Sequence, residues 1–302
     1  MTTPGTWFKE LRLEFLTASV IPVLLAAAIA RYEKGLFDPY LFVMTLLGAV
    51  CLHLGTNVAN DYFDHISGND RANINYVRPF TGGSRLIQDG LIKPKEVLTT
   101  SILFFAAAAV IAAFLTAARG PAVIVFGLAG LFSGYFYCAP PLYLAYRGFG
   151  EFVVGLNFGI LIVLGTYYVQ TGTIAVGPLI AAMPLALLIT SVIVINEFQD
   201  SEADAQVGKR TLVVRLGTRR AVVMFALITL SSYIPLLAGA ASGLLPRPAL
   251  LGLFTLPLAV RAIMTAKRHH ASSRELSPAN ASTILCHALT GLLMFAGYII
   301  SA

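Results

Sequence analysis

Charged residues are scarce in this sequence: they make up 12% of its 302 residues, about half the share that soluble globular domains carry. Hydrophobic residues reach 57% and form long stretches, several of them near the roughly 20 residues that a helix needs to cross a membrane. This composition excludes an ordinary soluble enzyme. It predicts an all-α, polytopic integral membrane protein.

Cysteine is also scarce. Cys51, Cys138 and Cys286 lie in apolar surroundings, and none of them belongs to a CxxC pair. This pattern excludes a disulfide framework and a zinc site. We therefore expect the three cysteines to be buried packing residues.

The apolar runs predict nine membrane-spanning helices in a single domain covering residues 1–302. They lie at about 15–31, 40–59, 97–117, 121–140, 149–169, 176–197, 221–241, 247–264 and 281–301. The first run ends at Arg31, Tyr32 and Glu33 without the small-residue cleavage site of a signal peptide, so we expect it to remain as a span. Two long polar connections, about 60–96 and 198–220, are the places to look for chemistry, because long connections are often functional.

The placement of the cations predicts the orientation in the membrane. With nine spans, the N-terminus and the loops after spans two, four, six and eight share one side. That side holds 16 Lys and Arg residues: Lys9, Arg12, Arg71, Arg78, Arg85, Lys93, Lys95, Arg147, Lys209, Arg210, Arg215, Arg219, Arg220, Lys267, Arg268 and Arg274. The other side holds four, so the cation-rich side is expected to be cytoplasmic. The net charge of +6 is accordingly attributed to topology and lipid headgroups, and no nucleic-acid partner is predicted.

Two groups of polar residues repeat an Asn-then-Asp order at the cytoplasmic ends of predicted spans two and six. Their members are Asn57, Asp61 and Asp64 in the first group, and Asn196, Asp200 and Asp204 in the second. Within each group the residues are three or four positions apart, so they share one face of a helix. Two such faces at one membrane surface are expected to lie close together.

These oxygen-rich groups predict a metal site. Like charges one helical turn apart repel each other unless a cation compensates them. Carboxylate and amide oxygens without nearby His or Cys favour a hard cation, and room left for phosphate and water favours Mg²⁺ over Ca²⁺. A diphosphate held between the two groups, attached to a long apolar chain, would explain an enzyme that resides in a membrane. The alternative interpretation is that the acids only solvate the helix ends.

The residues around these groups resemble the two aspartate-rich motifs of the UbiA superfamily of intramembrane prenyltransferases. The first motif reads Asn57-Val-Ala-Asn60-Asp61-Tyr-Phe-Asp64, with Gly68 and Asp70 following, and the second reads Asn196-Glu-Phe-Gln-Asp200-Ser-Glu-Ala-Asp204, followed by Gly208-Lys209-Arg210. The resemblance covers almost the whole chain. The Asp64-x3-Gly68-x-Asp70 spacing, the run that ends at Arg215, and Tyr137-Cys-Ala-Pro-Pro-Leu with Tyr146-Arg147-Gly148 are most similar to the 1,4-dihydroxy-2-naphthoate prenyltransferases of menaquinone synthesis.

Two positions depart from the superfamily pattern. Leu13 follows Arg12, where many members have proline, which puts the role of Arg12 in question. The lysine that benzoate-prenylating relatives carry after span four has no counterpart in residues 144–147, which argues against that branch.

The resemblance implies nine helices around a central cavity, capped on the cytoplasmic side, and transfer of a polyprenyl group from an allylic diphosphate to an aromatic acceptor. It implies that the six residues of the two Asn-Asp groups hold Mg²⁺, with the four aspartates essential for catalysis. Tyr137 is expected to stabilise the allylic cation through its ring face. The expected substrate-binding residues are Arg12, Asn57, Arg78, Arg85, Arg147, Asn157, Asn196, Lys209 and Arg210.

Several alternatives stay open at this stage. Lys209 and Arg210 are either diphosphate ligands or topology-setting cations, and Asn157 either binds substrate or bonds between helices. His53 is interpreted as a satisfied core residue, and either Glu151 or Glu197 is the candidate base. Other acceptors, such as another quinone precursor, a chlorin or a glycerol phosphate, remain open, as do the chain length and the oligomeric state. A secondary transporter is disfavoured because the acids lie at one surface rather than near the membrane midplane.

Overall fold

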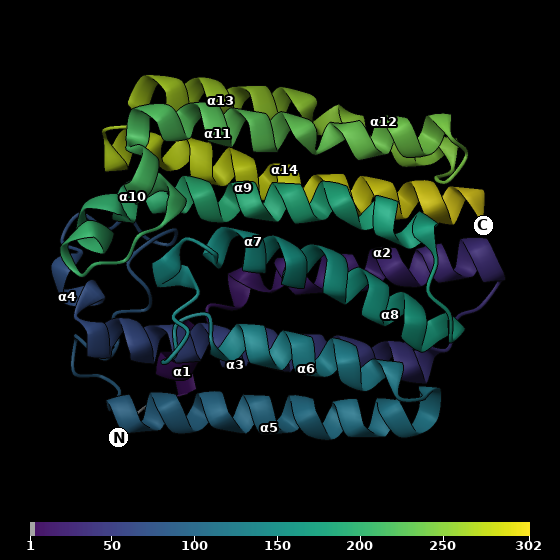
Figure 1. The fold of residues 1–302 in the computed structure, drawn as a ribbon, viewed down its shortest axis with the longest axis horizontal. Helices are drawn as coiled ribbons and strands as arrows, with labels where there is room; N and C mark the ends of the chain where they lie inside the picture. The colour runs from purple at the N-terminus through teal and green to yellow at the C-terminus, as the bar shows by residue number, and fades with distance from the viewer. Residues whose placement is uncertain (1–3) are drawn as a thin grey trace.

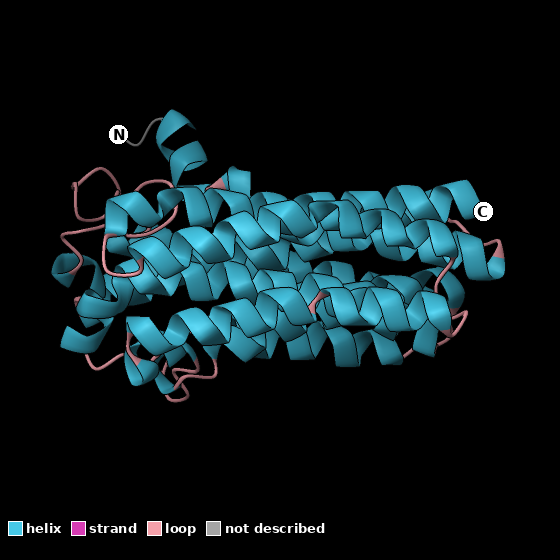
Figure 2. Cartoon of the chain, turned by 90° about the horizontal axis from the view of Figure 1, so that it is seen from above, coloured by secondary structure: helices cyan, strands magenta, loops and turns pink. Residues whose placement is uncertain are grey.

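The computed structural model describes residues 4–302, and helices are the only regular elements in that part of the chain. Figures 1 and 2 show an elongated bundle in which most helices run along the long axis. The elements are α1 (Pro4–Leu11), η1 (Leu13–Leu16), α2 (Thr17–Lys34), α3 (Pro39–Ser67), α4 (Asn69–Ala72), α5 (Pro94–Arg119), α6 (Ala122–Tyr135), η2 (Ala145–Arg147), α7 (Gly150–Gly155), η3 (Leu156–Leu161), α8 (Ile162–Thr171), α9 (Val176–Gln206), α10 (Leu212–Leu216), α11 (Thr218–Ser231), α12 (Tyr233–Ala241), η4 (Arg247–Thr255), α13 (Leu256–His269) and α14 (Ser273–Ser301).

Eight helical stretches within residues 4–302 are long and apolar enough to cross a membrane. They are Leu13–Lys34, Pro39–Ser67, Pro94–Arg119, Gly150–Thr171, Val176–Gln206, Thr218–Ala241, Arg247–His269 and Ser273–Ser301. Each corresponds to one of the nine apolar runs. The run at 121–140 forms the 14-residue α6, which at about 1.5 Å per residue is about 21 Å long and shorter than a hydrocarbon core.

Local sequence explains where the helices begin and end. Asp38 caps α3 by accepting the N–H groups of Tyr40 (2.9 Å) and Leu41 (3.0 Å), and Pro39 occupies the first helical turn. Gly68 ends the same helix in the left-handed conformation, at φ 79°, which costs glycine little. Because Gly68 separates α3 from α4, the chain turns four residues after Asp64 and brings the following polar residues back over the bundle.

The apolar core lies where α2, α8, α9, α12, η4 and α14 meet, and its fully buried members include Leu25, Leu185 and Met294. Glycine allows a close approach between two helices here, because a Cβ on Gly159 would come within 2.4 Å of Ala186 on α9. Gly159 belongs to the π-helical turn η3, which interrupts the helix between α7 and α8. Turns of this kind re-aim side chains and are frequent at functional sites.

The polar connections gather at one end of the bundle. The short helices α4 and α10 lie at that end, at the left of Figure 1, and the C-terminus lies at the opposite end. The same end receives the C-terminal halves of α3 and α9, which carry both Asn-Asp groups. The fold therefore brings the two groups, 132 or more positions apart in the sequence, to one surface of the molecule.

Candidate active site

A cavity of about 640 Å³ runs from this polar end into the bundle. Its mouth is lined by Asp64, Asp70, Asp200, Asp204 and Lys209, and its deeper wall is mostly apolar. The deep wall is built from α2, α3, α5, α6, η3, α8 and α9. A polar mouth on a long apolar cavity suits a substrate with a charged head and a hydrocarbon chain.

The first Asn-Asp group divides between two environments. Asn57, Asn60 and Asp64 line the cavity, and the Asn60 amide donates to Asp64 Oδ2 at 2.9 Å. The side-chain amide of Asn57 has no hydrogen-bond partner among residues 4–302, so it is available to a ligand. The hydroxyl of Tyr146 donates to Asp64 Oδ1 at 3.2 Å.

Asp61 is turned toward a different part of the protein. Its Oδ2 accepts the N–H of Ser84 at 2.9 Å, and the Ser84 hydroxyl donates to Glu10 Oε2 at 2.6 Å. Burial, reinforced by the nearby charge of Asp61, raises the pKa of Glu10 to about 7. One oxygen each of Asp61 and Glu10 is buried without a partner. Asp61 is therefore adjacent to the cavity mouth rather than among its lining residues.

The second group is held by amides from α4 and from the residue that follows it. Asn69 donates to Asp204 Oδ1 at 2.7 Å and Asn73 donates to Asp200 Oδ1 at 2.6 Å, which makes two contacts one helical turn apart. These two asparagines are functional candidates that the sequence analysis missed. Asn196 also lines the cavity, and its Oδ1 accepts from Asn280 of α14 at 2.8 Å.

Asp70 is a further acidic residue that the structure adds to the site. It lines the cavity and accepts from Gln88 at 2.6 Å. Burial, together with the charges of Asp64 and Asp61, raises the pKa of Asp70 to about 8. A carboxyl group with this environment gains from a nearby cation. The signal in the sequence that points to Asp70 is the Asp64-x3-Gly68-x-Asp70 spacing.

The predicted cations separate into two groups. Lys209 reaches the mouth, where its Nζ lies 3.4 Å from Asp204 Oδ1 and 5.5 Å from the centre of the Tyr146 ring. The charges of Asp204 and Asp64 outweigh burial and raise the pKa of Lys209, so it stays protonated. Arg12 also lines the cavity, with its guanidinium 4.7 Å from the Phe15 ring.

The other four arginines lie outside the cavity lining. Arg78 lies in exposed surroundings 3.8 Å from Asp89, and Arg85 donates to the backbone carbonyls of Asp70 (2.7 Å) and Asn73 (3.1 Å). Arg147 and Arg210 line a separate surface hollow with Arg215. Arg85 therefore supports the loop that carries Asp70 and Asn73, and the geometry gives Arg78, Arg147 and Arg210 no contact with the cavity.

Residues predicted to act on the reacting groups lie deeper. Tyr137 lines the cavity just after α6, and burial raises the pKa of its phenol, so the ring stays neutral. Asn157, on η3, lines the cavity and accepts from the Ser133 hydroxyl at 2.9 Å. Of the two candidate bases, Glu197 lines the cavity, whereas Glu151 accepts the N–H of Leu212 at 2.6 Å and so caps α10.

The donor set at the mouth fits Mg²⁺ by type, because it consists of carboxylate and amide oxygens. Beside the mouth, one oxygen of Asp61 is buried and unpartnered. In the part of the chain that the structure describes, no group of three His, Cys, Asp or Glu residues converges on one metal position. The amides of Asn60, Asn69 and Asn73 donate hydrogen bonds to carboxylate oxygens that would otherwise bind a metal. These oxygens belong to Asp64, Asp204 and Asp200, respectively.

The comparison with protein families decides the assignment, because the model of the UbiA prenyltransferase family matches residues 19–296. The chain belongs to the UbiA prenyltransferase family. It is an enzyme that transfers prenyl groups. The predicted membership of this family is thus confirmed, and the matched range includes both aspartate-rich segments.

Two curated relatives are similar over most of the chain. The 1,4-dihydroxy-2-naphthoate octaprenyltransferase of Bacillus subtilis (strain 168) is 30% identical over 72% of this chain and 68% of its own. The 2-carboxy-1,4-naphthoquinone phytyltransferase of Synechocystis sp. is 28% identical over 98% of this chain and 95% of its own. Both names concern naphthoquinone-type acceptors.

Solved structures share the fold. A UbiA homologue from Aeropyrum pernix K1 in its apo form has a TM-score of 0.65 at 16% identity, covering 96% of this chain and 98% of its own. A UbiA homologue from Archaeoglobus fulgidus bound to GPP and Mg²⁺ has a TM-score of 0.61 at 16% identity, covering 96% and 99%. At these identities the likeness establishes the all-helical architecture.

Proposed function

We propose that this UbiA-type enzyme transfers a polyprenyl group from an allylic diphosphate to 1,4-dihydroxy-2-naphthoate in an Mg²⁺-dependent reaction of menaquinone synthesis. The observation that carries the proposal is the convergence of Asp64, Asp70, Asp200 and Asp204 from two sequence motifs at the mouth of a long apolar cavity. The two naphthoquinone-type relatives and the GPP- and Mg²⁺-bound homologue support it.

The residues at the mouth would share the work of binding the diphosphate. Asn57, Asp61, Asp64, Asn196, Asp200 and Asp204, together with Asp70, are the proposed metal ligands. Bound Mg²⁺ supplies positive charge that neutralises the departing diphosphate. Lys209 adds a fixed point charge at the same place. Arg12 is proposed to assist from the cavity wall, while Arg78, Arg85, Arg147 and Arg210 are proposed to support the loops around the mouth.

The deeper residues would act on the hydrocarbon and the ring. The neutral Tyr137 offers its ring face to the allylic cation, and the apolar wall excludes water that would capture that cation. In a hydroxynaphthoate, the carboxyl group leaves from the carbon that accepts the prenyl chain. A strong base is then unnecessary. Glu197 is proposed as the base only for acceptors in which the prenylated carbon carries a hydrogen that must be removed.

Purified protein, given Mg²⁺, a radiolabelled polyprenyl diphosphate and 1,4-dihydroxy-2-naphthoate, is expected to form an apolar product. Mass spectrometry should show the acceptor plus the prenyl group, minus CO₂ and one hydrogen, because the prenyl group replaces the whole carboxyl group. 4-Hydroxybenzoate, a chlorin and a glycerol phosphate serve as competing acceptors in parallel reactions. Product from one of these in place of the naphthoate product would reassign the acceptor, and formation of no product with any acceptor would contradict prenyl transfer.

We further propose that the whole chain forms one domain with nine crossings of the cytoplasmic membrane, α6 being the short one, and with the cavity mouth capped on the cytoplasmic side. The position of α1 toward one end of the bundle and of the C-terminus at the other supports an odd number of crossings. The 16 cations on the side of the mouth support the orientation.

Cysteine labelling tests this orientation. In intact bacterial cells, a membrane-impermeant maleimide is expected to label Lys34→Cys, and to label Lys95→Cys only after the cells are permeabilised. Both positions are exposed and lie at opposite ends of the bundle. The wild-type chain, with its three natural cysteines, gives the background. The reverse labelling pattern would invert the proposed topology.

A further inference from the structure

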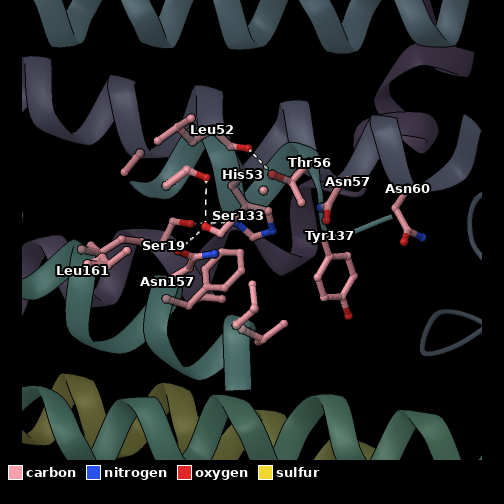
Figure 3. A pocket seen from close by; sticks show the side chains of 18 of the residues that line it. Ser19, Leu52, His53, Thr56, Asn57, Asn60, Ser133, Tyr137, Asn157 and Leu161 are labelled. Atoms are coloured by element: carbon pink, nitrogen blue, oxygen red, sulfur yellow. Dashed lines mark hydrogen bonds between the residues drawn. The ribbon is translucent and has the colours of Figure 1, made fainter. Parts of the chain in front are cut away.

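Four polar side chains form a cluster in the deep, mostly apolar wall of the cavity, beyond the residues assigned to metal and diphosphate. The cluster consists of Ser19 on α2, His53 on α3, Ser133 on α6 and Asn157 on η3. In Figure 3 they lie together, between Leu161 and the level of Asn57 and Tyr137. His53 is one helical turn, about 6 Å, deeper than Asn57 along α3. We name this set the deep polar cluster.

Each of the two larger side chains uses only part of its hydrogen-bonding capacity within the protein. His53 Nδ1 pairs with the Ser19 hydroxyl at 2.7 Å, and its second ring nitrogen has no partner among residues 4–302. Asn157 Oδ1 accepts from Ser133 at 2.9 Å, and its NH₂ group has no partner in the same range. His53 is 95% buried and lines the cavity, so its free ring nitrogen is available to a molecule in the cavity rather than to bulk solvent.

The backbone supports this arrangement. The π-helical turn Leu156–Leu161 places Asn157 and Phe158 in the cavity wall, and the Phe158 ring packs edge-on against His53 at 4.7 Å between ring centres. Ser19 and Ser133 fix the orientations of the imidazole and the amide from two further helices. At membrane depth, where neither lipid nor bulk water satisfies polar groups, such an arrangement marks a functional site.

The hydrogen-bonding groups of the cluster indicate which part of the substrates it would bind. A hydrocarbon chain has no hydrogen-bonding groups, and the diphosphate is accounted for by the carboxylates and Lys209 at the mouth. A hydroxylated aromatic ring supplies what remains, since a phenolic oxygen accepts from an amide NH₂ and its O–H donates to an imidazole nitrogen.

We propose that the deep polar cluster is the acceptor subsite, in which His53 and Asn157 hydrogen-bond a ring hydroxyl of the aromatic acceptor. The proposal rests on the proposed function and specifies which residues select the acceptor. Ser19 and Ser133 are positioning residues, because they act through His53 and Asn157. The sequence-based interpretation of His53 as a core residue accounts for its burial and its partner, but not for its place in the cavity wall.

Binding measurements without Mg²⁺ test the subsite separately from turnover. The probes are 1,4-dihydroxy-2-naphthoate and its two mono-O-methyl ethers, each titrated against purified protein by intrinsic fluorescence or thermal shift. His53→Phe keeps an aromatic ring but removes both nitrogens, and Asn157→Leu keeps the volume but removes the amide. Each is expected to weaken acceptor binding by about tenfold or more and to leave the KM for the prenyl diphosphate unchanged.

The ethers give a test that a merely structural role would not satisfy. Wild-type protein should prefer the dihydroxy compound to one ether by about tenfold, and His53→Phe should abolish this preference. His287→Phe is the matched control, since His287 is a buried histidine of α14 outside the cavity lining. Ser19→Ala provides a milder variant that should reduce the preference in part, should His53→Phe fail to fold.

The outcomes separate the two proposals. Unchanged acceptor binding in the folded variants, or equal weakening of acceptor and prenyl diphosphate, overturns the subsite while leaving the enzyme's function intact. Wild-type protein that neither binds nor prenylates any hydroxylated aromatic overturns the proposed function, and the subsite with it. Loss of the hydroxyl preference in His53→Phe together with unchanged prenyl diphosphate kinetics supports the subsite.

Discussion

Asp204→Asn is expected to lower kcat by at least about a thousandfold while the protein keeps its fold. Asp204 is held at the mouth by two polar partners, Asn69 at 2.7 Å and Lys209 at 3.4 Å. The substitution preserves its size but removes the charge that would hold a divalent cation. Electrostatic groups that stabilise the charge developing in a transition state contribute effects of this order. Product formation from a radiolabelled prenyl diphosphate at saturating Mg²⁺ measures the loss.

Glu202→Gln is the matched control, because it removes a carboxylate from the same helix two positions away, where the side chain is exposed. It should leave kcat within experimental error. Size-exclusion chromatography and circular dichroism show whether both variants fold. Full Mg²⁺-dependent activity in a folded Asp204→Asn protein would remove Asp204 from the metal site and weaken the assignment of the whole second group.

The helix content of the fold follows closely from the apolar runs, because each run long enough to span a membrane must satisfy its backbone internally as a helix. The exception is the run at 121–140. Its last residues, through Cys138 and Ala139, are as apolar as a helix interior, yet α6 ends at Tyr135 and turns lead into Pro140 and Pro141. Proline disfavours continuation of a helix, so hydropathy overestimates the length of this element.

Helical geometry also explains why the first Asn-Asp group divides. Successive residues of a helix are about 100° apart around its axis, so Asp64 lies about 20° from Asn57 on one side, while Asp61 lies about 40° from Asn57 on the other side, at the edge of the shared face. Asn60 and Asp64 face the cavity, and Asp61 meets Ser84. The spacing predicted a shared face, but the loop that carries Ser84 has no periodicity from which its position could be derived.

The hydrogen-bond partners of the second Asn-Asp group could not be predicted from the sequence either. Asn69 and Asn73 lie in a polar connection, and only the turn at Gly68 brings them onto Asp204 and Asp200. The role of each loop cation was similarly undetermined. Lys209 and Arg210 are neighbours, yet Lys209 lines the cavity and Arg210 lines the surface hollow. The conformation of the loops determines which residues contact Asp200 and Asp204 and which of the two cations lines the cavity, and the sequence pattern does not specify that conformation.

Lys209→Met is expected to raise the KM for the prenyl diphosphate by about ten- to a hundredfold. A hydrogen bond to a charged group contributes about 1.5–3 kcal/mol, and the substitution keeps most of the side chain's volume while removing its charge. The apparent affinity for Mg²⁺ should not fall, because loss of a cation 3.4 Å from Asp204 removes a repulsion that a bound metal would experience. Initial rates over a grid of diphosphate and Mg²⁺ concentrations separate the two parameters.

Arg210→Met removes the same charge one position along the chain and provides the control. Its side chain is exposed and lines the surface hollow, so its KM for the diphosphate should remain close to that of the wild type. If Lys209 served only as a counter-ion for the carboxylates in the metal-free protein, Lys209→Met would lower thermal stability without Mg²⁺ and leave the KM unchanged. The selective rise in KM therefore distinguishes a diphosphate ligand from a structural ion pair, and its absence would assign Lys209 to the latter.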